Sequence, residues 1–334
     1  MHRHDAPEKS FIPVETDLDL AVRAAWLSYV GGHTQEQIAA RLGISRIKVT
    51  RLIARAQKEG LVHVFVEGRA ARWVALEDAL TARYDLAACV VTPTLGEDDL
   101  PLRALGNAGA RLLQGALERP EIQVVGMGHG RTLASVVEHL PRIPRRRVRF
   151  VSLLGSLTRS AAANPFDVIH RLAERAGGEA YFMPAPFFCN SVADREVLLA
   201  QKSLQDVFAL ARCASFMMIG IGTVAEDAHL LQTGMITGEE LAELRAAGAV
   251  GEVLGTFVDD AGVPVDVDVN RRSIAVGFDD LKGKEVVAIA GGHGKVGAVD
   301  AVLRSGIARI LVTDEQTAEG LLKRTQKREG LAAE

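Results

Sequence analysis

The segment GHTQEQIAARLGISRIKVTRLI, residues 32–53, predicts two short helices separated by a glycine turn. Thr34 and Gln37 have the spacing of a capping box, which marks the first turn of a helix. Gly43 can adopt the left-handed conformation that ends this helix, and Ser45 can cap the next one. The inward positions are apolar: Ile38, Leu42, Val49, Leu52 and Ile53. This order of helix, turn and second helix is that of a helix-turn-helix motif.

The outward face of the second helix is basic. Residues 41–60 contain six basic residues and one acidic residue, a net charge of +5 in a chain whose total is −3. A basic helical hairpin can simply be solvated, but here the charge coincides with the full turn pattern, which favours DNA binding. We expect base contacts from the start of the helix, at Ser45, Arg46, Ile47, Thr50 and Arg51. Phosphate contacts are expected from Lys48, Arg55 and Lys58.

The flanking sequence sets the expected domain boundaries. Residues 1–16 are polar and proline-bearing and are expected to form a disordered tail. Residues 17–68 are expected to form an all-α helix-turn-helix domain, and the segment LVHVFVEG at 61–68 predicts a short strand that would make the domain winged. Residues 69–325 are expected to form a second, larger domain.

The second domain alternates short apolar segments with amphipathic helices. The predicted strands are AACVVTP, IQVVGMG, VRFVSLLG, EAYFMPAP, FMMIGIG, VVAIAGG and ARILVTD. Their continuous apolar character is typical of strands buried on both faces of a parallel sheet. The alternation predicts an α/β, Rossmann-like effector domain with helices on both sides of the sheet.

Four of these strands run into glycine-rich loops, at residues 124–132, 152–160, 219–224 and 289–295. In an open parallel sheet the ligand crevice lies outside the carboxyl ends of the strands, so we expect the four loops to share one pocket. Arg131 and Thr132, at one helix start, and Lys295, at another, are candidates to hold a phosphate. His129 and His293 lie in the same loops and either face the ligand or are bonded within the loop.

A dinucleotide site is disfavoured, because the strand after the Gly126–Gly130 loop lacks the acidic residue that binds the ribose. No His or carboxylate spacing predicts a metal site, so no cofactor is expected. Residues 250–266 predict two strands joined by a turn at 260–262. Glu252, Asp259 and Asp266 there are candidates to accept hydrogen bonds from ligand hydroxyls. Alternatively, Asp259 and Asp260 form the turn.

The bulk composition is that of a soluble protein of about two domains, with 334 residues and 48% apolar residues. No apolar run is long enough for a membrane span, and no signal peptide is recognisable at the N-terminus. The three separated cysteines form neither a disulfide framework nor a metal motif. These features predict a cytoplasmic protein.

The sequence resembles the SorC family of bacterial sugar-responsive transcriptional regulators, from about residue 18 to 322. The similarity is carried by TQEQIAARLGISRIKVTRLIARAQKEGLV, GMGHGRTL, LLGSLTR, GEVLGTFVDDAG and AIAGGHGKVGAVDAVLRSG. RAAWLSYVGG, FVSLLGSLTR and PFFCNSVADREVLLAQ are most similar to its erythritol-catabolism regulators.

The resemblance implies an effector domain related to sugar-phosphate isomerases and deaminases that has lost their chemistry. It implies a dimer or tetramer that binds operator DNA and responds to a sugar, a sugar alcohol or a sugar phosphate. The family's effector-binding positions correspond here to Gly128, His129, Gly130, Arg131, Thr132, Gly155, Ser156, Asp259 and Lys295. His129 replaces a frequent aromatic residue, Glu252 a frequent aspartate, and Thr256 a frequent basic residue, so an unphosphorylated polyol is also a candidate ligand.

The leading hypothesis is therefore a DNA-binding transcriptional regulator without enzymatic activity. The alternative is a sugar-phosphate isomerase or deaminase with an appended DNA-binding domain. It would need a catalytic acid and base, for which Asp259 and His293 are the candidates.

Overall fold

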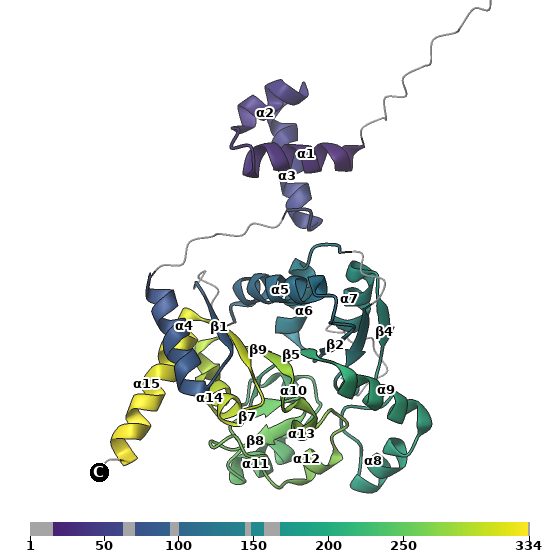
Figure 1. Cartoon of the computed structure of the whole chain (residues 1–334), viewed down its shortest axis with the longest axis vertical. Coiled ribbons are helices and arrows are strands. Elements are labelled where there is room, and N and C mark those ends of the chain that lie inside the picture. The colour runs from purple at the N-terminus through teal and green to yellow at the C-terminus, as the bar shows by residue number, and fades with distance from the viewer. Residues whose placement is uncertain (1–15, 63–70, 94–99, 144–147, 157–167, 333–334) are drawn as a thin grey trace, which may run out of the picture. The chain divides into compact units, whose positions relative to one another are not determined.

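The computed structural model describes residues 16–62, 71–93, 100–143, 148–156 and 168–332 (Figure 1). The chain divides into two compact units, residues 1–66 and 67–334. The expected tail up to residue 15 and most of the expected wing strand, residues 63–68, lie outside the described residues. No helix in the described ranges is long and apolar enough to cross a membrane.

The first unit is a three-helix bundle of α1 (Asp17–Tyr29), α2 (Gln35–Leu42) and α3 (Arg46–Lys58). The Thr34 side chain accepts from the Gln37 amide, and the Gln37 side chain accepts from the Thr34 amide, so the predicted capping box is confirmed. Gly43 ends α2 at φ 65°, and Ser45 caps α3. The predicted helix-turn-helix is therefore present. Its core comprises Ala21, Ala24, Ala25, Leu27, Ile38, Val49, Leu52, Ile53 and Ala56.

The second unit is built on a seven-stranded sheet with the strand order β1-β10-β9-β5-β2-β3-β4, parallel throughout. All seven predicted strands belong to it: β1 (Ala88–Thr92), β2 (Val124–Met127), β3 (Arg149–Ser152), β4 (Glu179–Tyr181), β5 (Phe216–Gly220), β9 (Glu285–Ile289) and β10 (Ile310–Asp314).

Helices cover both faces of this sheet. The described helices of the second unit are α4 (Ala71–Tyr84), α5 (Leu102–Glu118), α6 (Arg131–His139), α7 (Val168–Ala176), α8 (Val192–Leu199), α9 (Lys202–Cys213), α10 (His229–Gln232), α11 (Gly238–Ala246), α12 (Asp268–Arg272), α13 (Phe278–Leu281), α14 (Val296–Arg304) and α15 (Glu315–Ala332), with a 3-10 turn η1 (His293–Lys295).

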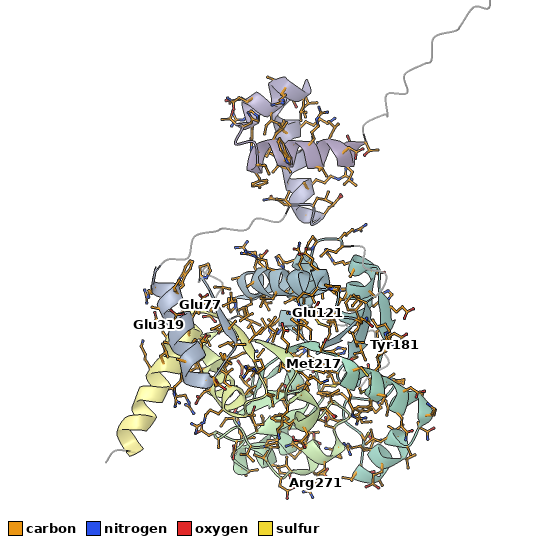
Figure 2. All side chains as sticks on the ribbon, in the orientation of Figure 1. Glu77, Glu121, Tyr181, Met217, Arg271 and Glu319 are labelled. Carbon is orange, nitrogen blue, oxygen red and sulfur yellow. The ribbon has the colours of Figure 1, made fainter. Side chains whose placement is uncertain are left out.

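Alternation along the strands divides the hydrophobic core into two layers. In β5, Phe216 and Met218 point into the layer with α5, α6 and α7, whereas Met217 and Ile219 point into the layer with α4, α9, α14 and α15. Burial on both faces explains the continuous apolar character of the strand segments. Figure 2 shows Met217 inside the unit and Tyr181 on β4. β4 departs from the prediction: it is an edge strand, and Glu179 is exposed.

The strand order reverses between β5 and β2. From β2 the chain proceeds outward through β3 and β4, returns to β5 beside β2, and then proceeds the other way through β9 and β10. At such a topological switch the two neighbouring connections leave the sheet on opposite faces and open a crevice. The fold therefore places the crevice above the carboxyl ends of β2 and β5.

A small antiparallel sheet lies in the second unit, formed by β6 (Gly222–Thr223), β7 (Gly251–Val253) and β8 (Thr256–Val258). The predicted turn at 260–262 is present, and Val258 pairs antiparallel with Pro264 across it. The prediction missed a second bend, at Leu254 and Gly255, both at positive φ, which joins β7 to β8. The sequence did not reveal the bend because leucine rarely adopts positive φ.

Candidate DNA-binding surface and candidate effector pocket

The predicted base-contacting residues lie exposed at the start of α3. Ile47, Thr50 and Arg51 occupy the side of the helix opposite the buried Val49 and Leu52. Ile47 is 75% exposed. The outer face of α3 is thus available to another molecule.

Several of these side chains are held by α2. An Arg46 guanidinium nitrogen donates to Glu36 Oε1 at 2.9 Å, and the Thr50 hydroxyl donates to Gln35 Oε1 at 2.9 Å. Both groups of the Arg46–Glu36 pair are mostly exposed, so the pair contributes little stability and can exchange for a DNA contact. Ser45 has a structural role as well, because its hydroxyl accepts from the Lys48 amide.

Lys48 and Arg55 are seven residues apart and share one flank of α3. Lys48 Nζ lies 3.9 Å from Asp17, and Arg55 Nε donates to Glu59 at 2.7 Å. Their position beside the outer face suits contacts with the phosphate backbone rather than with bases.

The effector unit contains a cleft of about 740 Å³, open to solvent, at the reversal between β2 and β5. All four predicted loops contribute to its wall. The described residues that line it are Leu100, His129, Gly130, Arg131, Thr132, Leu154, Phe187, Gly220, Ile221, Gly222, Thr223, His229, Leu230, Glu252, Leu254 and Lys295.

Five of the nine predicted effector residues line this cleft, and four do not. His129, Gly130, Arg131, Thr132 and Lys295 line it, whereas Gly128, Gly155, Ser156 and Asp259 do not. Gly128 and Gly155 have packing roles instead. A Cβ at Gly155 would lie 2.5 Å from the Pro186 carbonyl oxygen, and one at Gly128 would press on Leu133 and Leu254.

Asp259 forms a turn. Its carboxylate accepts from the amides of Ala261 and Val263, both at 2.9 Å, which is the second of the two roles considered for it. His293 is exposed at the start of η1 and is also outside the lining. The pair proposed for the enzymatic alternative, Asp259 and His293, is therefore absent from the described lining.

Lys295 and Glu252 are the charged groups set deepest in the wall. Lys295 Nζ donates to the Ile221 carbonyl at 2.7 Å, and desolvation, followed by repulsion from Arg131, lowers its pKa to about 8. Glu252 Oε1 accepts from the Gly255 amide at 2.6 Å, and desolvation raises its pKa to about 7. Near neutral pH the Glu252 carboxyl can therefore accept a hydrogen bond from a ligand hydroxyl when it is ionised, or donate one to it when it is protonated.

Two histidines complete the polar lining. The Ser152 hydroxyl donates to the Leu154 carbonyl at 2.7 Å, so it must accept from His129 Nε2 at 2.9 Å, and that ring nitrogen carries a proton. Burial, followed by Arg131 and Lys295, lowers the pKa of His229. The cleft thus combines basic groups and one carboxyl with apolar side chains.

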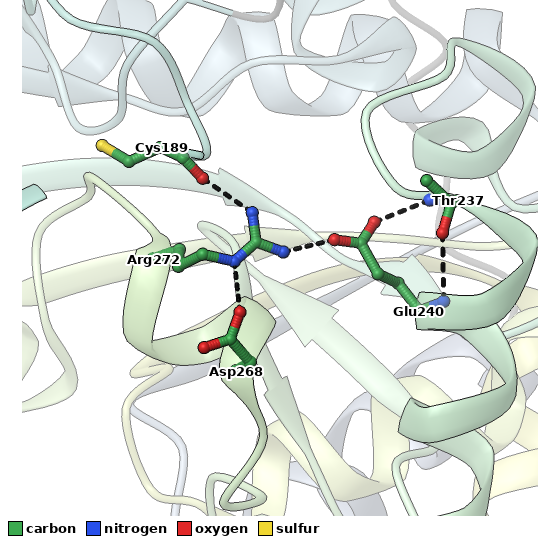
Figure 3. A network of polar contacts seen from close by, with 5 residues as sticks. All are labelled: Cys189, Thr237, Glu240, Asp268 and Arg272. Carbon is green, nitrogen blue, oxygen red and sulfur yellow. Dashed lines mark hydrogen bonds and ion pairs between the residues drawn. The ribbon is translucent and has the colours of Figure 1, made fainter. Parts of the chain in front are cut away.

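The wall at Phe187 is supported by a buried ionic network (Figure 3). Arg272 donates to Asp268 at 2.6 Å, to the Cys189 carbonyl at 2.6 Å, and to Glu240. Glu240 and Thr237 form the capping box of α11. The Cys189 amide donates back to the Arg272 carbonyl at 3.0 Å, so the network fixes the segment that carries Phe187.

The sequence left the role of Glu252 open and gave no signal for Phe187, His229, Leu230 and Leu100, which also line the cleft. Glu252 was recognisable as an acid beside the small sheet. The others come from segments without a glycine loop or charge pattern, and only the folded chain brings them to the cleft. The glycines of the fourth loop serve a different purpose: Gly292 donates its amide to Asp314 at 2.8 Å.

Comparisons with known proteins cover both units. Residues 69–323 match the family described as "Putative sugar-binding domain", and residues 17–64 match a homeodomain-like domain. The erythritol catabolism regulatory protein EryD of Brucella abortus (strain 2308) is 46% identical over 308 residues, covering 92% of this chain and 98% of that protein. The transcriptional regulator LsrR of Enterobacter sp. (strain 638) is 34% identical, covering 92% and 94%.

A solved structure agrees with these matches. The full-length sorbitol operon regulator SorC from Klebsiella pneumoniae superimposes with a TM-score of 0.69 at 25% identity, covering 92% of this chain and 99% of that one. These similar proteins are named as transcriptional regulators, which supports the regulator hypothesis and not the enzymatic alternative. The chain belongs to the SorC-type family of transcriptional regulators, which join a helix-turn-helix to a sugar-binding domain.

Proposed function

We propose that the protein regulates carbohydrate or polyol catabolism, and that a sugar, sugar alcohol or sugar phosphate bound in the cleft sets its affinity for operator DNA. The observation that carries this proposal is the cleft at the strand reversal, lined by Arg131, Lys295 and Glu252, in a chain whose other unit is a helix-turn-helix. The name of EryD directs attention to erythritol and related polyols.

The cleft suits a ligand with several hydroxyls. α6 begins at Arg131 and its N-cap, Gly130, has no side chain to bond the first amides, so these amides, with Arg131 and Thr132, favour an anionic or oxygen-rich group. Glu252, in contrast, is an acidic side chain that can accept hydrogen bonds from ligand hydroxyls. Lys295 is electrostatically coupled to both Arg131 and Glu252, and it can bind either a phosphate or a hydroxyl oxygen.

The proposal extends to assembly and location. One helix-turn-helix contacts a single segment of the major groove, so useful discrimination requires two copies on a near-palindromic operator. We therefore propose a homodimer or homotetramer that acts in the cytoplasm, where operator DNA lies. Light scattering of the full chain, alone and with operator, tests this: one copy bound per operator would contradict it.

The ligand test is calorimetry with erythritol, related polyols and their phosphates, with and without an operator duplex obtained by in vitro selection. A regulatory ligand should bind with affinities that differ by about 1–3 kcal/mol between the two conditions, because coupling between sites is reciprocal. A ligand that binds equally well in both conditions, or no binding by any of these compounds, would contradict the proposal.

Lys295→Met provides the residue-level test, with Lys282→Met on an exposed lysine as its matched control. Lys295→Met should weaken a phosphorylated ligand by about 1.5–3 kcal/mol, because it removes a charge-assisted hydrogen bond, and a neutral polyol by less. Neither variant should change the affinity of the ligand-free protein for operator DNA.

A further inference from the structure

α14 contains a buried carboxylate that lies outside the described lining of the cleft. Asp300, in the second turn of this helix, is 3% exposed and has buried apolar neighbours on both sides. Tyr84, at the end of α4, donates its hydroxyl to Asp300 Oδ1 at 2.8 Å, and Arg324, on α15, donates to Oδ2 at 3.0 Å. A buried ion pair often contributes less stability than apolar side chains of similar volume. Stability alone therefore does not account for Asp300.

α14 is also the helix to which the two deepest charged groups of the cleft are attached. Lys295 is its N-cap. Glu252 lies on β7, where the neighbouring Gly251 packs directly on α14: a Cβ at Gly251 would lie 3.1 Å from Ala298 Cα. A ligand that binds Lys295 must compete with the Ile221 carbonyl, which accepts from Nζ at 2.7 Å. Ligand binding therefore acts on the start of α14.

α4 is the first described element of the effector unit, so the chain from the DNA-binding unit enters the effector unit through this helix. Figure 1 shows α4 beside α14 and α15. Near the start of α4, Arg72 pairs with Glu315 on α15, but the arginine is mostly exposed and the pair is weak. At the end of α4, Tyr84 reaches α14 itself through Asp300.

We propose that the Tyr84–Asp300 hydrogen bond transmits the effect of a bound ligand from α14 to α4, and so to the DNA-binding unit. Tyr84 would be a positioning residue, because it is outside the described lining and acts through α14. This inference rests on the proposed function, in which a ligand in the cleft changes the affinity for operator DNA.

The surroundings of Asp300 allow this hydrogen bond to form and break. Tyr84 is only partly buried, so its hydroxyl can exchange the carboxylate for water. Arg324 can remain bonded to Asp300 meanwhile, so no buried charge is left unpaired. The contact therefore has two accessible arrangements, which is the property that energetic coupling between distant sites requires.

The first test measures coupling in the full chain by calorimetry, with the polyols and polyol phosphates named above, erythritol first. The ratio of ligand affinities with and without the selected duplex is the coupling factor, which is typically about 5- to 150-fold. Tyr84→Phe should lower this factor by about threefold or more, since substitutions within coupling networks typically change it by about two- to thirtyfold. Ligand affinity without DNA should stay within about twofold of wild type, because Tyr84 shares no contact with the lining.

Tyr181→Phe is the matched control. It also removes one tyrosine hydroxyl, which donates to Glu179 on the edge strand β4, and it should keep the wild-type coupling factor. A purely structural role of Tyr84 would lower the free energy of unfolding and leave the coupling factor unchanged, which would contradict the inference.

The second test is hydrogen exchange of the full chain, followed by mass spectrometry with and without the same compounds. Amides of α14 should respond to ligand in the wild type, in Tyr84→Phe and in Tyr181→Phe, because the helix starts beside Lys295. Amides in the last turns of α4 should respond in the wild type and in Tyr181→Phe, but not in Tyr84→Phe. An unchanged response of α4 in Tyr84→Phe would contradict the inference.

The outcomes distinguish the inference from the proposed function. If the wild type shows coupling and Tyr84→Phe has the same factor, the inference fails and the proposed function stands. If Tyr84→Phe weakens ligand binding equally with and without DNA, Tyr84 supports the cleft itself, and the inference also fails. If none of the compounds binds the wild type differently with and without operator, the proposed function and the inference fail together.

Discussion

The two units of this protein place their functional residues in opposite ways. The candidate DNA contacts come from Ser45 to Lys58, within fourteen consecutive residues, and are exposed on one helix and its cap. The cleft draws its lining from Leu100 to Lys295, and its two central charged groups are buried enough to shift their pKa values strongly. Local, exposed contacts should act nearly independently, whereas residues joined through a buried network should act together.

The largest expected effect is in the buried network. Arg272→Leu should lower the free energy of unfolding of the effector unit by about 3–5 kcal/mol, because it leaves Glu240 and the Cys189 carbonyl without their partner. Arg271→Leu is the matched control, since its pair with Asp266 is exposed, and it should cost about 1 kcal/mol or less. Urea unfolding, followed by the fluorescence of Trp73, which packs against the effector core, measures the free energy of unfolding of both variants. If the two variants lost the same free energy of unfolding, the buried network would contribute no more than an exposed ion pair, and the contrast between buried and exposed residues would not hold.

The next effect concerns pH. The pKa of Glu252 is about 7 in the folded chain and near 4.5 when unfolded. Between these values the folded state holds a proton that the unfolded state has released, so stability falls as the pH rises through this window. Glu252→Gln should therefore stabilise the ligand-free effector unit by about 2–3 kcal/mol above pH 7, and the gain should vanish toward pH 4.5.

Thermal unfolding across this pH range measures the Glu252 effect. Glu226→Gln, on an exposed glutamate, should follow the wild-type curve throughout. If the stability of Glu252→Gln followed pH in parallel with that of the wild type, the Glu252 carboxyl would ionise in the folded chain at its ordinary pKa.

A smaller effect is expected on the exposed side of the comparison. Arg46→Ala should weaken binding to the selected duplex by about 1–3 kcal/mol if the guanidinium contacts a base edge. It should change binding to unrelated DNA much less. Unchanged affinity in an Arg46→Ala/Arg51→Ala double variant, measured by gel shift, would exclude both residues from sequence recognition.

The smallest effect is expected at Lys48. Lys48→Ala should weaken binding to specific and unrelated duplexes alike and reduce the slope of log affinity against log salt by about 1, because one phosphate contact is lost. Titrations at several salt concentrations measure this. A loss confined to the selected duplex would instead assign Lys48 to base contacts and remove the proposed distinction between the outer face of α3 and its flank.

The sequence was most informative where structure is local. The capping box at Thr34, the left-handed Gly43 and the cap at Ser45 are all present, because each depends on residues three or four positions apart. The seven strands could also be predicted, because burial on both faces requires continuous apolar segments. Their glycine-rich ends could be assigned to one cleft, because parallel strands share their carboxyl edge.

The sequence by itself therefore determined the helix-turn-helix, the α/β class and the general place of the ligand site. Only the tertiary structure decided which loop residues reach the cleft. Gly155 follows its strand as expected, but its amide donates to the Ile274 carbonyl. Because the Pro186 backbone lies close to it, Gly155 has a packing role and does not line the cleft. Glu252 enters the wall through a bend at Leu254 and Gly255 that no local pattern marked. Such roles depend on contacts between residues far apart in the chain, and these are set by packing rather than by neighbouring sequence.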